Sequence, residues 1–223
     1  MTLFKLQDDR KISIRTDYSD TPKYQLLLAH GAGAGMNHSF LEQVAANLSK
    51  MNASVTRFNF PYMEEGRRSP GSPKKNVMVF SDVLEHIKNQ DPALPVVLSG
   101  KSYGGRIASH WVSESSKKSL VSAIVYLGFP LHSAGKPSKD RASHLASIKI
   151  PQLFVQGTRD ALAKYELIRE VVQSCEKAEL FTIEHANHSF SVARKHTQKS
   201  PEELIWGFCE QINHWILEQI SHS

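Results

Sequence analysis

Short apolar runs alternate with amphipathic segments along most of the chain. Runs of apolar and β-branched residues bounded by polar or glycine-rich positions predict strands. They occupy residues 3–6, 11–16, 24–29, 54–58, 95–98, 122–127, 152–156 and 179–183. Apolar residues at helical spacing predict helices over residues 40–51, 77–88, 106–112, 163–174 and 202–220. The intervening segment 61–76, rich in proline, glycine and arginine, is expected to be a loop.

Strands that alternate with helices indicate an α/β fold, built on a mainly parallel twisted sheet with helices on both faces. Because the length is typical of one domain, residues 1–223 are expected to form a single domain. Functional groups in such sheets lie beyond the carboxyl ends of the strands. Candidate chemistry is therefore sought directly after predicted strands.

The composition indicates which partners and which cellular compartment to expect. The formal net charge of +5 suggests an acidic partner, but the basic residues occur as scattered pairs without a nucleic-acid-binding pattern, which favours a solvated surface. The sequence has no signal-peptide pattern and no run of membrane-spanning length. The two cysteines, Cys175 and Cys209, cannot form a disulfide framework. We expect a cytoplasmic monomer or small homo-oligomer without nucleic-acid or membrane partners.

The segment 98–105, LSGKSYGG, contains a Gly-x-Ser-x-Gly motif centred on Ser102. A predicted strand precedes the motif and a predicted helix follows it, which is the context of a nucleophile elbow. In that turn the serine lies in strained backbone geometry at a helix N-terminus, where N–H groups favour developing negative charge. Because a bare Gly-x-Ser-x-Gly also arises by chance in turns, the interpretation depends on partners elsewhere in the chain.

A serine hydroxyl needs a base, and the base needs a carboxylate that orients it. Downstream of Ser102 the aspartates are Asp140 and Asp160. Asp160 is favoured because it follows a predicted strand, although capping the next helix is an alternative role. His188 is favoured over His185 as the base, because its longer loop can reach the elbow.

A glycine-rich run, residues 30–35, follows the predicted strand 24–29. Such a run directs backbone N–H groups toward a site, so the N–H groups of Ala32 and Tyr103 are the expected oxyanion donors. The run also resembles a phosphate cradle, but it lacks the following Gly-Lys-Ser/Thr. His30, Gly31 and Gly33 are candidate substrate-binding residues beside these donors.

Five segments together resemble one branch of the α/β-hydrolase superfamily, the dienelactone-hydrolase-like branch. They are residues 30–36 (HGAGAGM), 57–63 (RFNFPYM), 66–68 (GRR), 100–106 (GKSYGGR) and 154–160 (FVQGTRD). The branch also includes testis-expressed homologues and a chromatin-complex subunit. The resemblance implies an α/β-hydrolase fold with Ser102, Asp160 and His188 as a catalytic triad. Asn187 stands where the branch often has an aspartate before the histidine.

These observations predict a serine hydrolase that cleaves a small ester or thioester without a metal or cofactor. The connection 128–149 is too short for a large lid, so we expect an open site for a small-molecule acyl substrate. Arg67, Arg68 and Lys101 are candidate residues for attracting an anionic substrate, although a solvated basic loop also explains the arginine pair. The alternative function is a non-catalytic protein-interaction module on the same fold.

Overall fold

The structure is a computed structural model, and it describes residues 1–221. Its elements in chain order are β1 (Thr2–Lys5), β2 (Lys11–Asp17), β3 (Tyr24–Ala29), α1 (Ser39–Ser49), β4 (Ala53–Phe58), α2 (Pro61–Glu64), α3 (Pro73–Gln90), β5 (Val96–Lys101), α4 (Tyr103–Glu114), β6 (Ala123–Leu127), β7 (Gln152–Gly157), α5 (Tyr165–Gln173), β8 (Ala178–Ile183) and α6 (Pro201–Ser221). None of the helices in this described part is long and apolar enough to cross a membrane.

The eight strands form one sheet in the order β1-β2-β4-β3-β5-β6-β7-β8. The pairs β1–β2 and β2–β4 are antiparallel, and every later pair is parallel. The central strands β3, β4, β5, β6 and β7 are buried almost throughout, which is why they read as continuous apolar runs. The mainly parallel α/β sheet predicted from the sequence is therefore confirmed.

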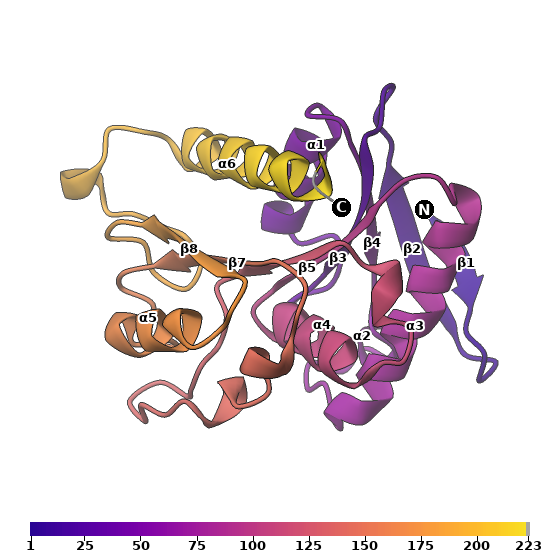
Figure 1. Ribbon diagram of the computed structural model, residues 1–223, viewed down its shortest axis with the longest axis horizontal. Helices are drawn as coiled ribbons and strands as arrows, with labels where there is room; N and C mark the ends of the chain where they lie inside the picture. The colour runs from indigo at the N-terminus through magenta and orange to yellow at the C-terminus, as the bar shows by residue number, and fades with distance from the viewer. Residues whose placement is uncertain (222–223) are drawn as a thin grey trace.

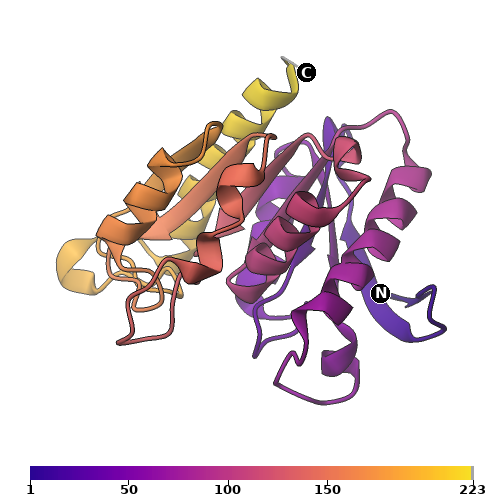
Figure 2. The same ribbon diagram turned by 60° about the horizontal axis from the view of Figure 1, so that its bottom comes forward.

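Helices cover both faces of the sheet (Figure 1). Helices α1 and α6 pack on one face through apolar residues such as Leu41, Val44 and Ile212. Helices α3, α4 and α5 pack on the other face, through Phe80, Ile107 and Ile168 among others. Figure 2 shows these three helices side by side in front of the sheet, with α6 behind it.

The region after β4 differs from the expected loop over residues 61–76. Helix α2 occupies Pro61–Glu64, and α3 begins at Pro73 rather than at residue 77. Both helices have proline in the first turn, where its missing N–H and fixed φ suit a helix start. Prolines taken as loop signals are therefore helix-initiating residues here.

The connection from β6 to β7 contains two short 3-10 helices, Asp140–Ala142 and Leu145–Ser147. It carries no α-helical insertion among its residues, all of which are described, so the expectation of no large lid is confirmed. Because β3, β5, β7 and β8 run in parallel, their carboxyl ends lie at one edge of the sheet. The segments after these strands meet at that edge and build the site.

Candidate active site

Ser102 occupies a strained turn between β5 and α4. Its φ of 51° and ψ of −113° place it in a region that residues with a side chain rarely adopt. The neighbouring glycines allow the turn. A Cβ at Gly100 would lie 2.3 Å from the Gly105 nitrogen, and one at Gly104 would lie 2.5 Å from the Ala29 carbonyl oxygen. The sequence forms this turn because side chains are absent where strand and helix approach each other.

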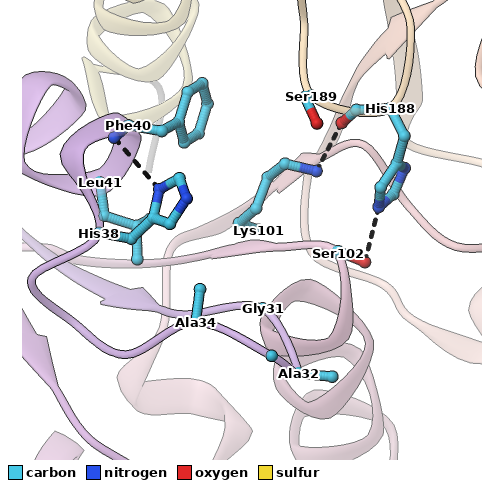
Figure 3. Close-up of a pocket in the computed structure, with 11 residues that line it drawn as sticks. Gly31, Ala32, Ala34, His38, Phe40, Leu41, Lys101, Ser102, His188 and Ser189 are labelled. Carbon is cyan, nitrogen blue, oxygen red and sulfur yellow. Dashed lines mark hydrogen bonds between the residues drawn. The ribbon is translucent and has the colours of Figure 1, made fainter. Parts of the chain in front are cut away.

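A continuous series of hydrogen bonds links three side chains at the carboxyl edge of the sheet. His188 Nε2 lies 2.9 Å from Ser102 Oγ, a contact drawn in Figure 3. On the other side of the ring, His188 Nδ1 lies 2.7 Å from Asp160 Oδ2. The Asp160 side chain is 1% exposed and that of His188 is 24% exposed, so the series runs from the interior toward solvent. The structure thus brings together the serine, histidine and aspartate singled out in the sequence.

The Asp160 carboxylate accepts hydrogen bonds on both oxygens. Besides His188, the Gln156 side-chain amide donates to Oδ2 over 2.6 Å, and the backbone N–H of Leu162 donates to Oδ1 over 2.7 Å. Asp160 does not cap α5, because the residue before that helix is Lys164. These bonds fix the carboxylate in a buried position. They also supply the donors without which a buried carboxylate would be unfavourable.

The other acid and base candidates lie elsewhere. Asp140 is exposed in the first 3-10 helix of the β6–β7 connection. The ring of His185 stacks on that of His196, with centroids 3.9 Å apart, and both line a separate cavity between the β8 region and α6. Neither Asp140 nor His185 makes a hydrogen bond to Ser102 in the described structure.

The glycine-rich segment after β3 is held in place by His30. The His30 ring is fully buried, and its Nε2 accepts a hydrogen bond from the Phe60 N–H over 3.0 Å. The ring proton is therefore on Nδ1, and Nδ1 donates to the Gly31 carbonyl over 2.7 Å. Burial lowers the pKa of His30 to about 4, so the ring is neutral at pH 7. In residues 1–221, the backbone N–H groups of Ala32 and Tyr103 have no protein acceptor. Both are therefore available to a ligand at Ser102.

A cavity of about 300 Å³ opens beside Ser102. The lining residues are Gly31, Ala32, Gly33, Ala34, His38, Phe40, Leu41, Lys101, Ser102, His188 and Ser189. Figure 3 shows one wall formed by the start of α1 and the opposite wall formed by His188. His38 also caps α1, since its Nδ1 accepts from the Phe40 N–H over 3.3 Å.

The arginine pair proposed as substrate-binding residues lies outside this lining. Arg67 forms an ion pair with Glu65, and both arginines are exposed. Lys101 does line the cavity, but its Nζ atom donates to the His188 carbonyl oxygen over 2.7 Å. Neither arginine lines the cavity beside Ser102, and their exposure agrees with the alternative of a solvated basic loop; a contact with substrate stays a prediction.

Gln156 is a site residue that the sequence analysis missed. It is fully buried at the end of β7, where its amide donates to Asp160 and its Oε1 accepts from the Phe129 N–H over 3.0 Å. The available signal was a polar residue at the end of an otherwise apolar strand, four positions before the acid. No cluster of three or more His, Cys, Asp or Glu side chains that could hold a metal is present among the described residues.

A serine on an elbow, a histidine and a buried aspartate at the carboxyl edge of a mainly parallel sheet define the class of α/β hydrolases. Comparison with protein families agrees with this assignment. Residues 22–217 match the family model described as an alpha/beta hydrolase domain. The chain belongs to this family.

Solved structures of similar fold include three from bacteria. Est1E from Butyrivibrio proteoclasticus, solved with ferulic acid, is 15% identical with a TM-score of 0.79, and the match covers 99% of this chain and 100% of that one. Dienelactone hydrolase from Anabaena variabilis is 17% identical with a TM-score of 0.75, covering 97% of each chain. A serine hydrolase without a lid from Xanthomonas campestris is 17% identical with a TM-score of 0.74, covering 96% of this chain and 93% of that one. At these identities the similarity establishes the shared fold.

Proposed function

We propose that this protein is a serine hydrolase that cleaves small esters or thioesters through an acyl-enzyme, with residues 1–223 acting as one domain. The observation that carries the proposal is the series Ser102 Oγ–His188 Nε2–Asp160 Oδ2, with separations of 2.9 and 2.7 Å, beside an open cavity. A binding scaffold does not require a buried carboxylate that orients a histidine toward a strained serine.

In the proposed first half-reaction, His188 accepts the Ser102 proton as Oγ attacks the substrate carbonyl carbon. Asp160 holds the proton of His188 on Nδ1 and stabilises the imidazolium that forms. The N–H groups of Ala32 and Tyr103 stabilise the negative charge on the carbonyl oxygen, and losing one such donor typically lowers kcat by about 10²–10³-fold. His188 then protonates the departing alcohol or thiol, which leaves the acyl group on Ser102.

In the second half-reaction, His188 removes a proton from water as the water oxygen attacks the acyl-enzyme. The tetrahedral intermediate collapses, Ser102 regains its proton from His188, and the carboxylic acid leaves. Each step uses only side chains and backbone N–H groups of this chain. The ferulic acid bound to Est1E is itself a carboxylic acid, the kind of product that ester hydrolysis releases.

The size and surface of the cavity support a short acyl chain. The cavity measures about 300 Å³, and Ala34, Phe40 and Leu41 contribute an apolar wall beside the glycine-rich segment. Among the described residues, no lid insertion covers the cavity. Both cysteines are free and buried, which suits a reducing compartment such as the cytoplasm.

Labelling with a fluorophosphonate probe tests the proposal. The wild-type protein should be labelled, and Ser102→Ala should be unlabelled and at least about 10³-fold less active toward p-nitrophenyl acetate. A panel of p-nitrophenyl esters from acetate to octanoate, with one thioester, then assigns the acyl preference. Absence of labelling in the wild type, or equal labelling of Ser102→Ala, would refute the serine mechanism and favour the interaction module.

A further inference from the structure

Lys101 lies directly before Ser102 in the chain, and its side chain extends toward His188 rather than toward solvent. Nζ lies 2.7 Å from the His188 carbonyl oxygen and donates a hydrogen bond to it. Figure 3 shows the side chain crossing the cavity wall between the start of α1 and His188. The elbow strand is thereby joined to the loop that carries the base by a contact separate from Ser102.

The Lys101 ammonium has no carboxylate within ion-pair distance among residues 1–221. Burial lowers its pKa to about 8, with the Asp160 charge acting in the opposite direction. The ring of Phe190, whose centroid is 5.3 Å from Nζ, provides a cation–π contact. Lys101 is half-buried, and partly withdrawing an ammonium from water without an ion pair is unfavourable, so this placement is less stable than that of an exposed lysine.

The loop after β8 is tied to the segment after β7 by two hydrogen bonds, from the Arg159 N–H to the Ala186 carbonyl and from the His185 N–H to Thr158 Oγ1, and neither involves His188. Two of its residues, His185 and Phe190, have φ of 60°, which is unfavourable for residues with a side chain. The Asn187 side chain ties the loop to itself by accepting from the N–H groups of Ser189 and Ser191. In the described part of the chain, the hydrogen bonds that join His188 to the elbow come from Ser102 and Lys101.

Both ring nitrogens of His188 are already occupied, by Ser102 and by Asp160. A further hydrogen bond that fixes His188 without displacing these partners must be made to its main chain, as the bond from Lys101 is. Gly128 leaves the necessary space. A Cβ there would lie 3.2 Å from Lys101 Nζ and 3.6 Å from both His188 Nδ1 and the His188 carbonyl oxygen.

We propose that Lys101 is a positioning residue: its hydrogen bond to the His188 carbonyl holds the base at the distance and orientation that Ser102 requires. This inference rests on the proposed function, and it differs from a role in binding an anionic substrate. A positioning role predicts a loss in kcat for every substrate. A substrate-binding role predicts a higher KM for anionic substrates alone.

Lys101→Met removes the ammonium and keeps most of the apolar stem. We expect kcat toward neutral p-nitrophenyl acetate to fall about 10- to 100-fold, because small displacements of a reacting group have effects of that size, with KM nearly unchanged. Lys88→Met is the matched control. Lys88 also donates to backbone carbonyls, those of Pro92 and Leu94, but it lies on α3 away from the site, and its replacement should leave kcat unchanged.

Chemical rescue separates positioning from damage to the fold. In Lys101→Cys, the thiolate at position 101 displaces bromide from 2-bromoethylamine and regains an ammonium at the length of lysine. The native thiols are buried and their pKa values are raised, that of Cys209 to about 12, so they react slowly. We expect alkylation to restore most of the lost kcat. Failure to restore it in a protein with wild-type thermal stability would overturn the proposal.

Proton NMR of the free protein gives a readout that needs no substrate. The His188 Nδ1–H bonded to Asp160 should give a low-field resonance in the wild type and in Lys88→Met, and it should broaden or shift in Lys101→Met. The positioning role is overturned if this resonance is unchanged in Lys101→Met and kcat is also unchanged. It is equally overturned if the resonance is unchanged and the variant shows only a raised KM for anionic esters. If the wild type hydrolyses nothing, the proposed function fails, while this resonance still decides whether Lys101 positions His188.

Discussion

His30 Nδ1 donates to the carbonyl oxygen of Gly31 across 2.7 Å, and the same peptide group carries the N–H of Ala32. The two ends of a trans peptide point in opposite directions. Holding the Gly31 carbonyl toward His30 therefore holds the Ala32 N–H away from it. The Phe60 N–H fixes the other ring nitrogen, so the ring cannot change tautomer without losing a bond. A buried histidine thus orients the proposed oxyanion donor without touching the substrate.

This relationship predicts different effects of two amide substitutions at position 30. His30→Asn keeps a donor near the place of Nδ1, whereas His30→Gln places its amide near Nε2 and loses the bond to Gly31. We expect His30→Asn to keep kcat for p-nitrophenyl acetate within about tenfold of wild type, and His30→Gln to lose about 10²-fold, as when an oxyanion donor is lost. Equal kcat values in the two variants would contradict the proposed role of His30.

The same residue predicts a loss of stability in acid. Its folded pKa is about 4, against 6.5 for an ordinary histidine, so the unfolded chain binds more protons between these values. The stability that neutral His30 provides is complete above pH 6.5 and is lost as the pH falls toward 4. Urea unfolding measures the free energy of unfolding at pH 7.5 and at pH 4. Between these pH values it should fall by up to roughly 3 kcal/mol more in the wild type than in His30→Asn. The other histidines are common to both proteins and cancel in this difference.

Gln156 and Gln152 are buried glutamines on the same strand, and they offer a matched pair. Gln156 joins the Phe129 N–H to Asp160, whereas Gln152 joins the Tyr126 hydroxyl to the Leu145 carbonyl, away from the site. Replacing either by leucine leaves a buried polar group unpaired and should destabilise the protein by about 1–3 kcal/mol. Only Gln156→Leu should also lower kcat, because only that variant frees the Asp160 carboxylate to rotate. Steady-state kinetics and urea unfolding of both variants test this difference.

Two glycines near the serine should respond differently to alanine. A Cβ at Gly104 would meet the Ala29 carbonyl oxygen at 2.5 Å and its carbon at 2.7 Å, and neither backbone atom can move cheaply. We expect Gly104→Ala to unfold at a lower temperature and to lose fluorophosphonate labelling, because the elbow cannot close on β3. Gly33 has open space within 4 Å and an ordinary φ. Gly33→Ala should keep its thermal stability, because its Cβ would meet open space, and a stability loss equal to that of Gly104→Ala would argue against the steric explanation.

The positions of Ser102, Asp160 and His188 could be predicted because each lies in the segment that follows a strand, and because the longer loop favoured His188 over His185. Parallel strands bring their carboxyl ends together whatever their order in the sheet, so chain position alone indicates the shared edge. The partner of a side chain in a long loop cannot be predicted from its position in the chain in this way. The sequence left open whether the basic pair Arg67 and Arg68 contacts substrate or is a solvated loop. In the structure the pair is exposed and does not line the cavity, and Arg67 forms an ion pair with Glu65.

The contacts of Gln156 and Lys101 could not be predicted, because each depends on how one side chain is turned in the folded protein. Gln156 bonds Asp160 four positions away and the Phe129 N–H 27 positions away. The Lys101–His188 bond spans 87 positions. It lies beside Gly128 and Phe190, both of which have a left-handed φ. Nothing in the order of residue types specifies these conformations. The start of α3 was misjudged for a local reason, since proline both ends and begins regular structure.

The apolar wall of the cavity predicts how acyl length should be controlled. Ala34 lies on the glycine-rich segment and lines the cavity opposite His188 (Figure 3). Ala34→Phe should fill the part of the cavity that accepts the acyl chain beyond its first carbons. Because one methylene in an apolar pocket changes kcat/KM by about 10–200-fold, we expect at least about a tenfold loss for p-nitrophenyl butyrate relative to acetate. Measuring kcat/KM for both esters in one variant makes acetate the internal control, and an equal loss for the two would mean that the acyl chain binds elsewhere.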